Sequence, residues 1–521
     1  MADVSVLNNR KRAGTRRRSG VLAPLFSLYS RESFGVGDTE DLKLFVDWCV
    51  KTGNSIMQLL PMNEVGDNFC PYESISSFAI EPVYAPVGRG SFKLSARRVR
   101  ADYGVKGKKR ELLRRMYIES GGILPAEAEK FRRKNSWWIE DFCMFKVLKR
   151  RFGFRPWYEW SDAYRNRSSS ALKEVFSAER AEMDFEAWVQ WFLYERMREF
   201  KAYAGEKGVL VMGDLPVVIN RDSADVWAHP EFFKMELAAG APPDMFCVKG
   251  QRWGIPGMPT YDWEKIEGGG WRYIREKLKY AEEFYDILRI DHVVGLFRIW
   301  SIPIEEPLEN EGLNGFFDPP DEKLWREHGR KILSAMLEST GMLLCGEDLG
   351  VIPDACPEIM KSLGIPGIDV QRWKKEWRGS GDFLPPEKYR QLSVAALSTH
   401  DTSNWNDWWE RESSAREREQ MGKLLGISVH PEGKASPKIT EAALKFILEA
   451  RSVFSIQLIF DWLNLSPGIL KGWQSAYRIN TPGTVSGNNW SAVLPVFLEE
   501  LMSNGVCDKI RTLIAESGRL P

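Results

Sequence analysis

The 521-residue chain has 72 acidic and 72 basic residues, so its formal net charge at pH 7 is zero. This balance provides no bulk attraction to nucleic acid or to an anionic membrane, and no apolar run reaches the roughly 18 residues of a membrane span. Hydrophobic residues make up 43% of the chain, which is enough for a large core. Scattered cysteines and the lack of an apolar signal core favour a cytoplasmic protein without a structural zinc site.

Six basic residues gather near the N-terminus, at positions 10–12 and 16–18. They could form a nucleic-acid-binding or targeting patch, but a solvated, frayed end is the simpler interpretation. We therefore expect residues 1–19 to be a basic, flexible segment that precedes the folded domain.

From residue 20 onward, short apolar runs alternate with helical patterns, which indicates a parallel sheet with right-handed crossovers. Strands are expected at residues 21–26, 55–61, 209–215, 287–293, 343–347, 367–372, 394–399 and 458–463. Helices are expected between them, for example over 38–51, 185–206, 269–285 and 324–339. Eight strands of this kind predict an α/β fold, a single (β/α)₈ TIM barrel over residues 20–521.

Two gaps between expected strands are too long to be loops. The first, residues 62–208, is rich in Arg, Lys and Trp with helical periodicity and predicts a helical insertion subdomain. The second, residues 228–285, contains the Gly/Pro cluster Gly240 to Asp244 and predicts an insertion that roofs the cleft. Both segments begin after the carboxyl ends of expected strands. We therefore expect both insertions to cover that face of the barrel.

Three of the expected strands end in a carboxylate, namely Asp291, Glu347 and Asp401, at nearly regular intervals. The carboxyl ends of barrel strands meet at one rim, so the three acids should converge there. Glycosyl transfer needs a proton donor and a nucleophile on opposite sides of a sugar C1, and two or three carboxylates suit that chemistry. For any one strand alone, a capping Asp is the alternative interpretation.

Arg289 lies two residues before Asp291 and should project to the same strand face, where its charge keeps Asp291 ionised as a nucleophile requires. Glu347, close to that anion and partly desolvated, should have a raised pKa and act as the general acid. Asp401 would hold sugar hydroxyls and support positive charge on the ring. Asp214 ends another expected strand and should bind sugar or position the arginine, with a structural role as the alternative.

The role of His400 depends on where its strand ends, because strand geometry would point it away from Asp401. A satisfied structural histidine is the alternative for this residue. Aromatic side chains on loops near the acids suit the apolar faces of sugars, with simple packing as the alternative. They are Trp253 in a Gly-rich segment and Trp405, Trp408 and Trp409 after Asp401.

These residues together resemble the amylomaltases, which are 4-α-glucanotransferases of the α-amylase superfamily. The resemblance runs from about Gly20 to Trp490 and rests on motifs that occur in the same order. They begin at residues 71, 213, 222, 240, 250, 289, 346, 399 and 478 and read P-Y-E-S, G-D-L-P, D-S-A-D-V-W, G-A-P-P-D, G-Q-R-W-G, R-I-D-H, G-E-D-L-G, T-H-D and R-I-N-T-P-G-T.

The resemblance implies that Asp291 is the nucleophile, Glu347 the acid/base and Asp401 the transition-state stabiliser. The residues that it implies at the cleavage point are Tyr72, Asp214, Arg289 and His400, and those along the glucan cleft are Asp244, Trp253 and Asn480. It also implies a metal-independent enzyme without a cofactor, which uses α-1,4-glucans and maltooligosaccharides as donor and acceptor. A barrel without the C-terminal β-domain of classical amylases is expected.

Three places depart from the usual amylomaltase pattern: Val293-Val294 replaces Phe-Arg, Ile255 replaces Asn, and Thr402-Ser403-Asn404 replaces Asn-Asp-Thr. These variants look more like the branch of the plant cytosolic disproportionating enzyme, whose starch-binding modules are not found in this sequence. They leave the acceptor preference open. Two rival functions remain: an amylase-type hydrolase that uses the same carboxylates, and an inactive glycan-binding protein, which the intact acids disfavour.

Overall fold

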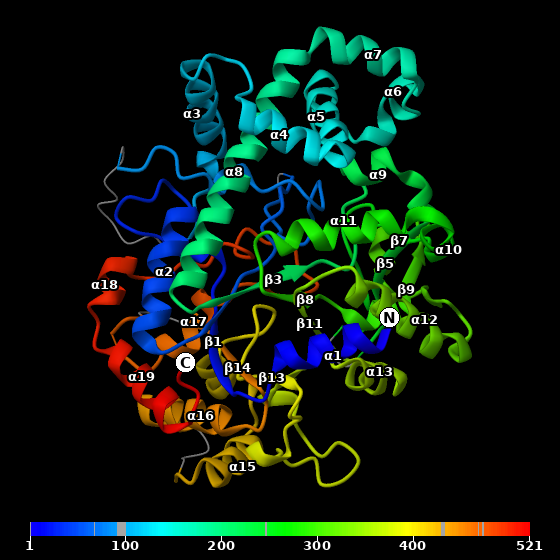
Figure 1. Cartoon of the computed structure of the whole chain (residues 1–521). Coiled ribbons are helices and arrows are strands. Elements are labelled where there is room, and N and C mark those ends of the chain that lie inside the picture. Colours follow the sequence, from blue (N-terminus) through cyan, green and yellow to red (C-terminus); the bar gives the residue numbers. More distant parts are fainter. Residues whose placement is uncertain are drawn as a thin grey trace.

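The computed structural model describes residues 2–66, 68–90, 100–244, 247–428, 433–466, 468–470 and 474–521. Eight parallel strands form its centre (Figure 1): β1 (Arg18–Leu22), β2 (Ile56–Gln58), β3 (Leu210–Leu215), β8 (Ile287–Ile290), β11 (Leu343–Gly346), β12 (Gly367–Val370), β13 (Ser393–Ala396) and β14 (Phe454–Leu458). Their hydrogen-bonded order is β11-β8-β3-β2-β1-β14-β13-β12. Between the two end strands, the amide of Gly346 donates to the carbonyl of Pro366 at 2.9 Å. The sheet is therefore a nearly closed (β/α)₈ barrel whose strands follow chain order.

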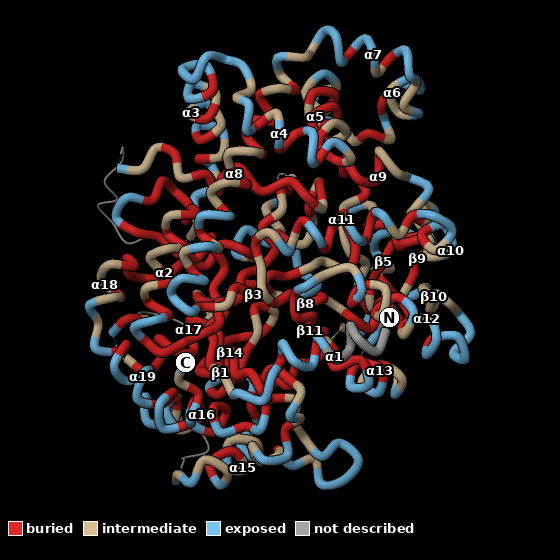
Figure 2. The backbone as a smooth tube through the Cα atoms, in the orientation of Figure 1, coloured by how far each residue is buried: buried red, intermediate tan, exposed pale blue. Residues whose placement is uncertain are grey.

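Helices connect these strands around the barrel, and buried residues run through the strands beneath them (Figure 2). They are α2 (Thr39–Thr52), α8 (Arg180–Glu206), α11 (Trp271–Glu282), α12 (Glu322–Glu338), α13 (Ala355–Leu363) and α16 (Pro437–Glu449). After β14 the chain forms α17 (Ile459–Leu463), α18 (Leu498–Met502) and α19 (Val506–Glu516). The β12–β13 connection, described throughout, has only 3₁₀ turns at Gln371–Trp373 and Pro386–Lys388. Across the described ranges, no helix is long and apolar enough to cross a membrane.

The predicted insertion over residues 62–208 contains a group of helices that extends away from the barrel in Figure 1. They are α3 (Lys106–Glu119), α4 (Ala126–Lys134), α5 (Ser136–Arg151), α6 (Asp162–Arg165) and α7 (Ser169–Ala178). Helix α8 also lies within this range, but it packs along α2 and leads directly into β3. It therefore serves both the helical group and the barrel.

The predicted insertion over residues 228–285 contributes to two small antiparallel sheets. One pairs β4 (Phe233–Lys234) with β7 (Thr260–Tyr261), and the other has the order β10-β9-β5-β6. In the second sheet, β5 (Leu237–Ala241) and β6 (Gln251–Arg252) are joined by β9 (Ile299–Pro303) and β10 (Phe316–Asp318), which lie outside the predicted range.

Four further helices lie in the connections between the barrel strands: α9 (Ala224–Ala228), α10 (Trp263–Lys265), α14 (Trp405–Asp407) and α15 (Ala415–Leu425).

Two of the expected strands differ from the structure at the ends of the series. The prediction of the eighth strand at residues 458–463 is wrong. Residues 459–463 form α17, and the eighth strand is β14, which ends at Leu458. All five residues of α17 are buried. A run that is apolar on every side has no alternation of apolar and polar residues, so its sequence cannot distinguish a helix from a strand. The first strand ends at Leu22 instead of continuing to residue 26, and Pro24, which has no N–H for a ladder, begins a 3₁₀ turn.

The N-terminal segment is helical, in contrast to the flexible segment expected over residues 1–19. Helix α1 (Ala2–Ala13) packs against α12 and β11. Asn9 is fully buried there; its side chain donates to the carbonyl of Gly364 at 2.6 Å and accepts from the amide of Leu344 at 3.1 Å. The clustered charges were the reason for the wrong prediction, because they do not reveal that Asn9 satisfies backbone groups of the barrel.

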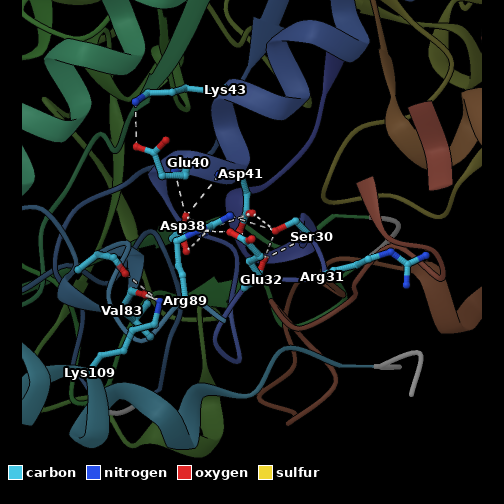
Figure 3. A network of polar contacts seen from close by, with 12 residues as sticks. Ser30, Arg31, Glu32, Asp38, Glu40, Asp41, Lys43, Val83, Arg89 and Lys109 are labelled. Atoms are coloured by element: carbon cyan, nitrogen blue, oxygen red, sulfur yellow. Dashed lines mark hydrogen bonds and ion pairs between the residues drawn. The ribbon is translucent and has the colours of Figure 1, made fainter. Parts of the chain in front are cut away.

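The loop between β1 and α2 is fixed by a buried ionic network (Figure 3). Asp38 and Asp41 form a capping box at the start of α2, and both side chains are fully buried. Arg89 Nη1 donates to Asp38 at 2.6 Å and to Asp41 at 3.1 Å, while Ser30 Oγ donates to Asp41 at 2.7 Å. Lys109 donates to the carbonyl of Val83 at 2.7 Å. The network therefore ties the loop to the 82–90 segment and to α3.

Candidate active site

A cavity of about 260 Å³ lies among the carboxyl ends of the barrel strands and the segment that follows β5. We call it the catalytic pocket. Six residues predicted from the sequence line it: Asp244, Trp253, Arg289, Glu347, His400 and Asp401. The other four are joined to these residues by hydrogen bonds or ion pairs, so all ten predicted residues belong to one site.

Arg289 is the centre of the site. It lies on β8, its side chain is 5% exposed, and its Nη1 bonds both oxygens of Asp214 at 2.7 Å. The same nitrogen lies 2.9 Å from Asp291 Oδ1, and Nη2 lies 3.8 Å from Glu347 Oε2. Parallel ladders from β3 to β8 and from β8 to β11 place these residues side by side at the strand ends. One guanidinium thus sets the relative positions of the two predicted catalytic acids.

Glu347 has the environment of a proton donor. Its Oε2 accepts the amide of His292 at 2.8 Å, and its Oε1 accepts the amide of Leu349 at 3.1 Å. Burial, with a further contribution from the charge of Asp291, raises the pKa of Glu347 to about 8 against the opposing effect of Arg289. The carboxyl is therefore protonated at neutral pH.

Asp291 differs from the expectation in one respect. Arg289 does lower its pKa, but burial has the larger effect, with added repulsion from Asp214 and Asp401, and raises it to about 6. At neutral pH Asp291 is still ionised next to a protonated Glu347. The two carboxyls therefore have the opposite protonation states that an acid and a nucleophile require.

A second hydrogen-bonded group forms the other side of the site. Tyr72 Oη donates to Asp214 Oδ2 at 2.8 Å and lies 2.9 Å from His400 Nε2. His400 Nε2 lies 3.2 Å from Asp401 Oδ2, and Asn480 Nδ2 donates to Asp401 Oδ1 at 2.7 Å. Burial acts to raise the pKa of Asp401, but His400 and these hydrogen bonds outweigh it and lower that pKa to about 2. Asp401 is therefore a fixed anion.

The structure shows why His400 and Asp214 lie where they do. Strand β13 ends at Ala396, so the alternation of a strand no longer applies at His400, which stacks on Tyr72 at 5.5 Å. Asp214 accepts from both Arg289 and Tyr72, so it positions the arginine, one of the two roles expected for it.

Of the four tryptophans that the sequence predicts near the acids, the structure places one at the pocket and three in the core. Trp253 lines the pocket, where its ring meets the edge of His292 at 5.0 Å, and Asp244 lines it nearby. The three tryptophans after Asp401 are at most 5% exposed and pack on one another: Trp405, Trp408 and Trp409. They are core residues, because α14 and the π-helical turn Trp408–Glu412 after it turn their side chains inward instead of leaving them on an open loop.

His292 is a residue of the site that the sequence analysis did not assign. Its backbone is left-handed, with φ of 43°, which turns its amide toward Glu347 and its ring toward Trp253. Burial and the nearby Arg298 and Arg289 lower its pKa to about 4, so its ring is neutral. Its place directly after Asp291 was a visible signal, but a backbone amide that binds a carboxylate cannot be recognised from residue type.

The described part of the chain contains no cluster of three or more His, Cys, Asp or Glu side chains that could hold a metal ion. The chemistry that the residues offer is that of carboxylates. A protonated Glu347 and an ionised Asp291 lie beside Arg289, and the anion of Asp401 is held by His400 and Asn480. This arrangement can protonate a leaving group, attack an electrophilic carbon and stabilise positive charge between them.

A family model described as 4-alpha-glucanotransferase matches residues 23–497 of the chain. The chain belongs to the 4-alpha-glucanotransferase family. Relatives with this name include a protein of Chlamydia caviae, 33% identical over 517 residues that cover 95% of this chain and 94% of the relative. The 4-alpha-glucanotransferase DPE2 of rice, Oryza sativa subsp. japonica, is 26% identical over 96% of this chain and 70% of its own. The chain is therefore an enzyme of the 4-alpha-glucanotransferase class.

Solved structures show the same fold as this member of the family. An amylomaltase from Streptococcus agalactiae, solved in complex with acarbose, has a TM-score of 0.82 at 23% identity, over 97% of this chain and 100% of that chain. An amylomaltase from Corynebacterium glutamicum has a TM-score of 0.77 at 18% identity, over 98% of this chain and 76% of that chain. These likenesses agree with the barrel and its order of strands.

Proposed function

We propose that the enzyme transfers glucosyl or maltooligosyl units between α-1,4-glucans by a retaining double displacement. In the first step Asp291 attacks C1 of the donor sugar, and the bond between C1 and the glycosidic oxygen breaks. Glu347 gives its proton to that oxygen, and the shortened glucan leaves with a free 4-hydroxyl. The product of this step is a glycosyl ester on Asp291.

In the second step the 4-hydroxyl of an acceptor glucan attacks C1 of the ester. Glu347, now ionised, takes the proton of that hydroxyl, and the bond to Asp291 breaks. Asp401 stabilises the positive charge on the ring in both transition states, and Tyr72, Asp214 and His400 hold the sugar. Two inversions at C1 leave the α-configuration unchanged.

The observation that carries the proposal is the placement of two buried acids beside one guanidinium, at 2.9 and 3.8 Å. The pKa of Glu347 is raised to about 8, whereas that of Asp291 is about 6. Arg289 Nη1 lies 2.9 Å from Asp291 and Nη2 lies 3.8 Å from Glu347, so one guanidinium holds both carboxylates close together, as a retaining pair requires. An inverting pair would need room for a water molecule between the sugar and its second carboxylate.

Transfer in preference to hydrolysis is supported by the acceptor side of the pocket. Trp253 provides an apolar ring and Asp244 a carboxylate at the segment after β5, and both line the pocket. An aromatic ring that stacks an acceptor sugar and a carboxylate that holds its hydroxyls give the 4-hydroxyl a high effective concentration over water. An amylase-type hydrolase is the second candidate, because the same carboxylates serve both reactions.

Trapping the covalent intermediate tests the mechanism. In Glu347→Gln, α-glucosyl fluoride should still react, because fluoride leaves without a proton donor, whereas the second step lacks its base. The variant should therefore accumulate an adduct heavier by one glucosyl residue, which mass spectrometry of the intact protein and of its peptides would locate on Asp291. With maltotriose the same variant should be severely impaired.

The matched control is Asp291→Asn, whose amide is nearly isosteric with the carboxylate but cannot form the ester. It should form no adduct with either donor and should lose at least about 10⁴-fold in kcat. An adduct on another residue, or activity of folded Asp291→Asn within tenfold of the wild type, would rule out Asp291 as the nucleophile.

A further inference from the structure

The turn that carries His400 and Asp401 is held from behind by a buried arginine. Arg372 follows β12 and is 6% exposed. Its Nη1 donates to Ser403 Oγ at 2.8 Å, and its Nη2 donates to the Ser403 carbonyl at 2.8 Å and to Ser398 Oγ at 3.2 Å. One guanidinium thus binds both ends of the 398–403 turn.

Groups on two other elements surround this guanidinium, namely the π-helical turn Trp408–Glu412 and α17. Glu412 Oε2 lies 3.4 Å from Nη1, and the ring of Trp408 lies 5.7 Å from the guanidinium carbon. The fully buried Asp461 of α17 accepts the amide of Trp405 at 2.6 Å and a hydrogen bond from Ser398. Burial lowers the pKa of Arg372 to about 10, so it is charged at neutral pH. The turn is therefore held by a dedicated set of polar groups behind the pocket.

One of the three departures from the usual amylomaltase pattern, Thr402-Ser403-Asn404, belongs to the same arrangement. Thr402 Oγ1 accepts the amide of Thr399 at 3.0 Å and closes the turn. Ser403 is the main acceptor of Arg372. Asn404 accepts the amide of Asp407 at 3.1 Å and begins α14. The side chains of Thr402, Ser403 and Asn404 thus each make a different hydrogen bond that holds the turn or the start of α14.

We propose that Arg372 is a positioning residue for the reaction, which clamps the 398–403 turn and so holds His400 and Asp401 against the donor sugar. The inference rests on the proposed function, because that function makes these two side chains part of the sugar site. Loss of the guanidinium leaves two serine hydroxyls and a buried carbonyl without their donor, so the turn shifts. A displacement of about 1 Å in such a group costs on the order of 10²-fold in rate.

The test compares Arg372→Met with a matched control at the other end of the barrel, Arg519→Met. Arg519 is also buried, and its guanidinium donates to backbone carbonyls of Leu448, Ala450 and Ser452, far from the pocket. Both variants should melt at lower temperature than the wild type. At a temperature at which both are folded by circular dichroism, Arg372→Met should lose at least about tenfold in kcat with maltotriose, with little change in KM. Arg519→Met should retain its kcat within about twofold.

A double-mutant cycle separates positioning from general destabilisation. Consumption of α-glucosyl fluoride is measured for Arg372→Met in the wild-type background and in the Asp401→Asn background. If Arg372 acts through the turn, the tenfold loss should shrink to about threefold or less once the Asp401 carboxylate is gone. Ser403→Ala should show the same dependence on Asp401.

Equal losses in both backgrounds, or an unchanged kcat in folded Arg372→Met, would overturn the proposal. This outcome is distinct from a failure of the proposed function. If the wild-type enzyme only hydrolyses maltotriose, transfer is wrong, but the fluoride cycle still measures whether Arg372 and Asp401 are coupled, because both reactions begin with the same glycosylation step.

Discussion

At the scale of single residues, burial has more influence than the nearest charge on the acids of the site. Arg289 touches Asp291 at 2.9 Å, yet the pKa of Asp291 is raised to about 6 because burial disfavours the anion. Glu347 lies farther from the same guanidinium, at 3.8 Å, and burial raises its pKa to about 8. Unequal contact with one arginine therefore separates two carboxyls that are both desolvated.

These pKa values predict a bell-shaped pH dependence of kcat/KM. Activity should increase as Asp291 loses its proton near pH 6 and decrease as Glu347 loses its proton near pH 8, with both limbs belonging to the coupled pair. Initial rates with maltotriose from pH 4.5 to 9.5 would show it. With α-glucosyl fluoride the first step needs no proton donor, so the basic limb of burst rates in Glu347→Gln should disappear. A basic limb that persists in this variant would contradict the assignment of Glu347.

At the scale of elements, those barrel strands could be predicted from the sequence whose apolar run ends in a polar residue of the site. The runs before Asp214, Asp291 and Glu347 became strands because each is short and β-branched or Leu-rich and leads to a polar rim. The run 459–463 has no such mark, and tertiary burial on all sides made it a helix. The antiparallel strands β5, β6, β9 and β10 were not predicted, because β6 and β10 have only two and three residues and β5 pairs with the distant β9, for example Gly240 with Trp300.

Whether a residue of the site could be predicted depends on whether its role is visible in a local motif. The three acids, Arg289 and Trp253 lie in motifs whose residue types match their chemistry. The inward packing of Trp405 and its neighbours depends on α14 and on the π-helical turn after it, and the hydrogen bonds of His292 and Arg372 depend on backbone groups and on turns. Such contacts appear only when the elements are assembled.

The buried network at the start of α2 provides a prediction about stability. Arg89→Met leaves Asp38 and Asp41 buried beside each other without their cation, and should cost about 3–5 kcal/mol in the free energy of unfolding. The matched control is Arg31→Met, which removes a surface ion pair with Glu500 and should cost less than about 1 kcal/mol. Urea unfolding of both variants at pH 7 measures the difference. Equal costs in the two variants would show that the network does not stabilise α2.

The pH dependence of this cost has a defined sign. Burial and the nearby Asp41 raise the pKa of Asp38 to about 6 against the effects of Lys109 and Arg89, so the folded state binds a proton that the unfolded state has lost above about pH 4. Protonation of Asp38 therefore contributes its full amount to the free energy of unfolding below about pH 4, and this contribution is lost as the pH rises through 6. The cost of Arg89→Met should therefore be smaller at pH 5 than at pH 7.

At the scale of the whole molecule, the basic N-terminal segment and the C-terminal end meet the same end of the barrel. Arg10 donates to the carbonyls of Lys361 and Ser362 at the end of α13, and Arg17 donates to Leu448 near the end of α16. Cations at helix C-termini interact favourably with the free carbonyls and with the helix dipole. The basic residues of the N-terminal segment thus cap helices instead of lying free in solvent, while the segments that follow β2 and β3 leave from the opposite end of the strands.

We expect the barrel to deliver the donor sugar to a second glucan in preference to water. Incubation with maltotriose, followed by chromatography of the products and a reducing-end assay, distinguishes transfer from hydrolysis. Transfer should give glucose together with a ladder of glucans longer than maltotriose, while the total number of reducing ends stays nearly constant, because each cleavage is matched by a new α-1,4 bond. A steady rise in reducing ends without any product longer than the substrate would contradict it and identify a hydrolase.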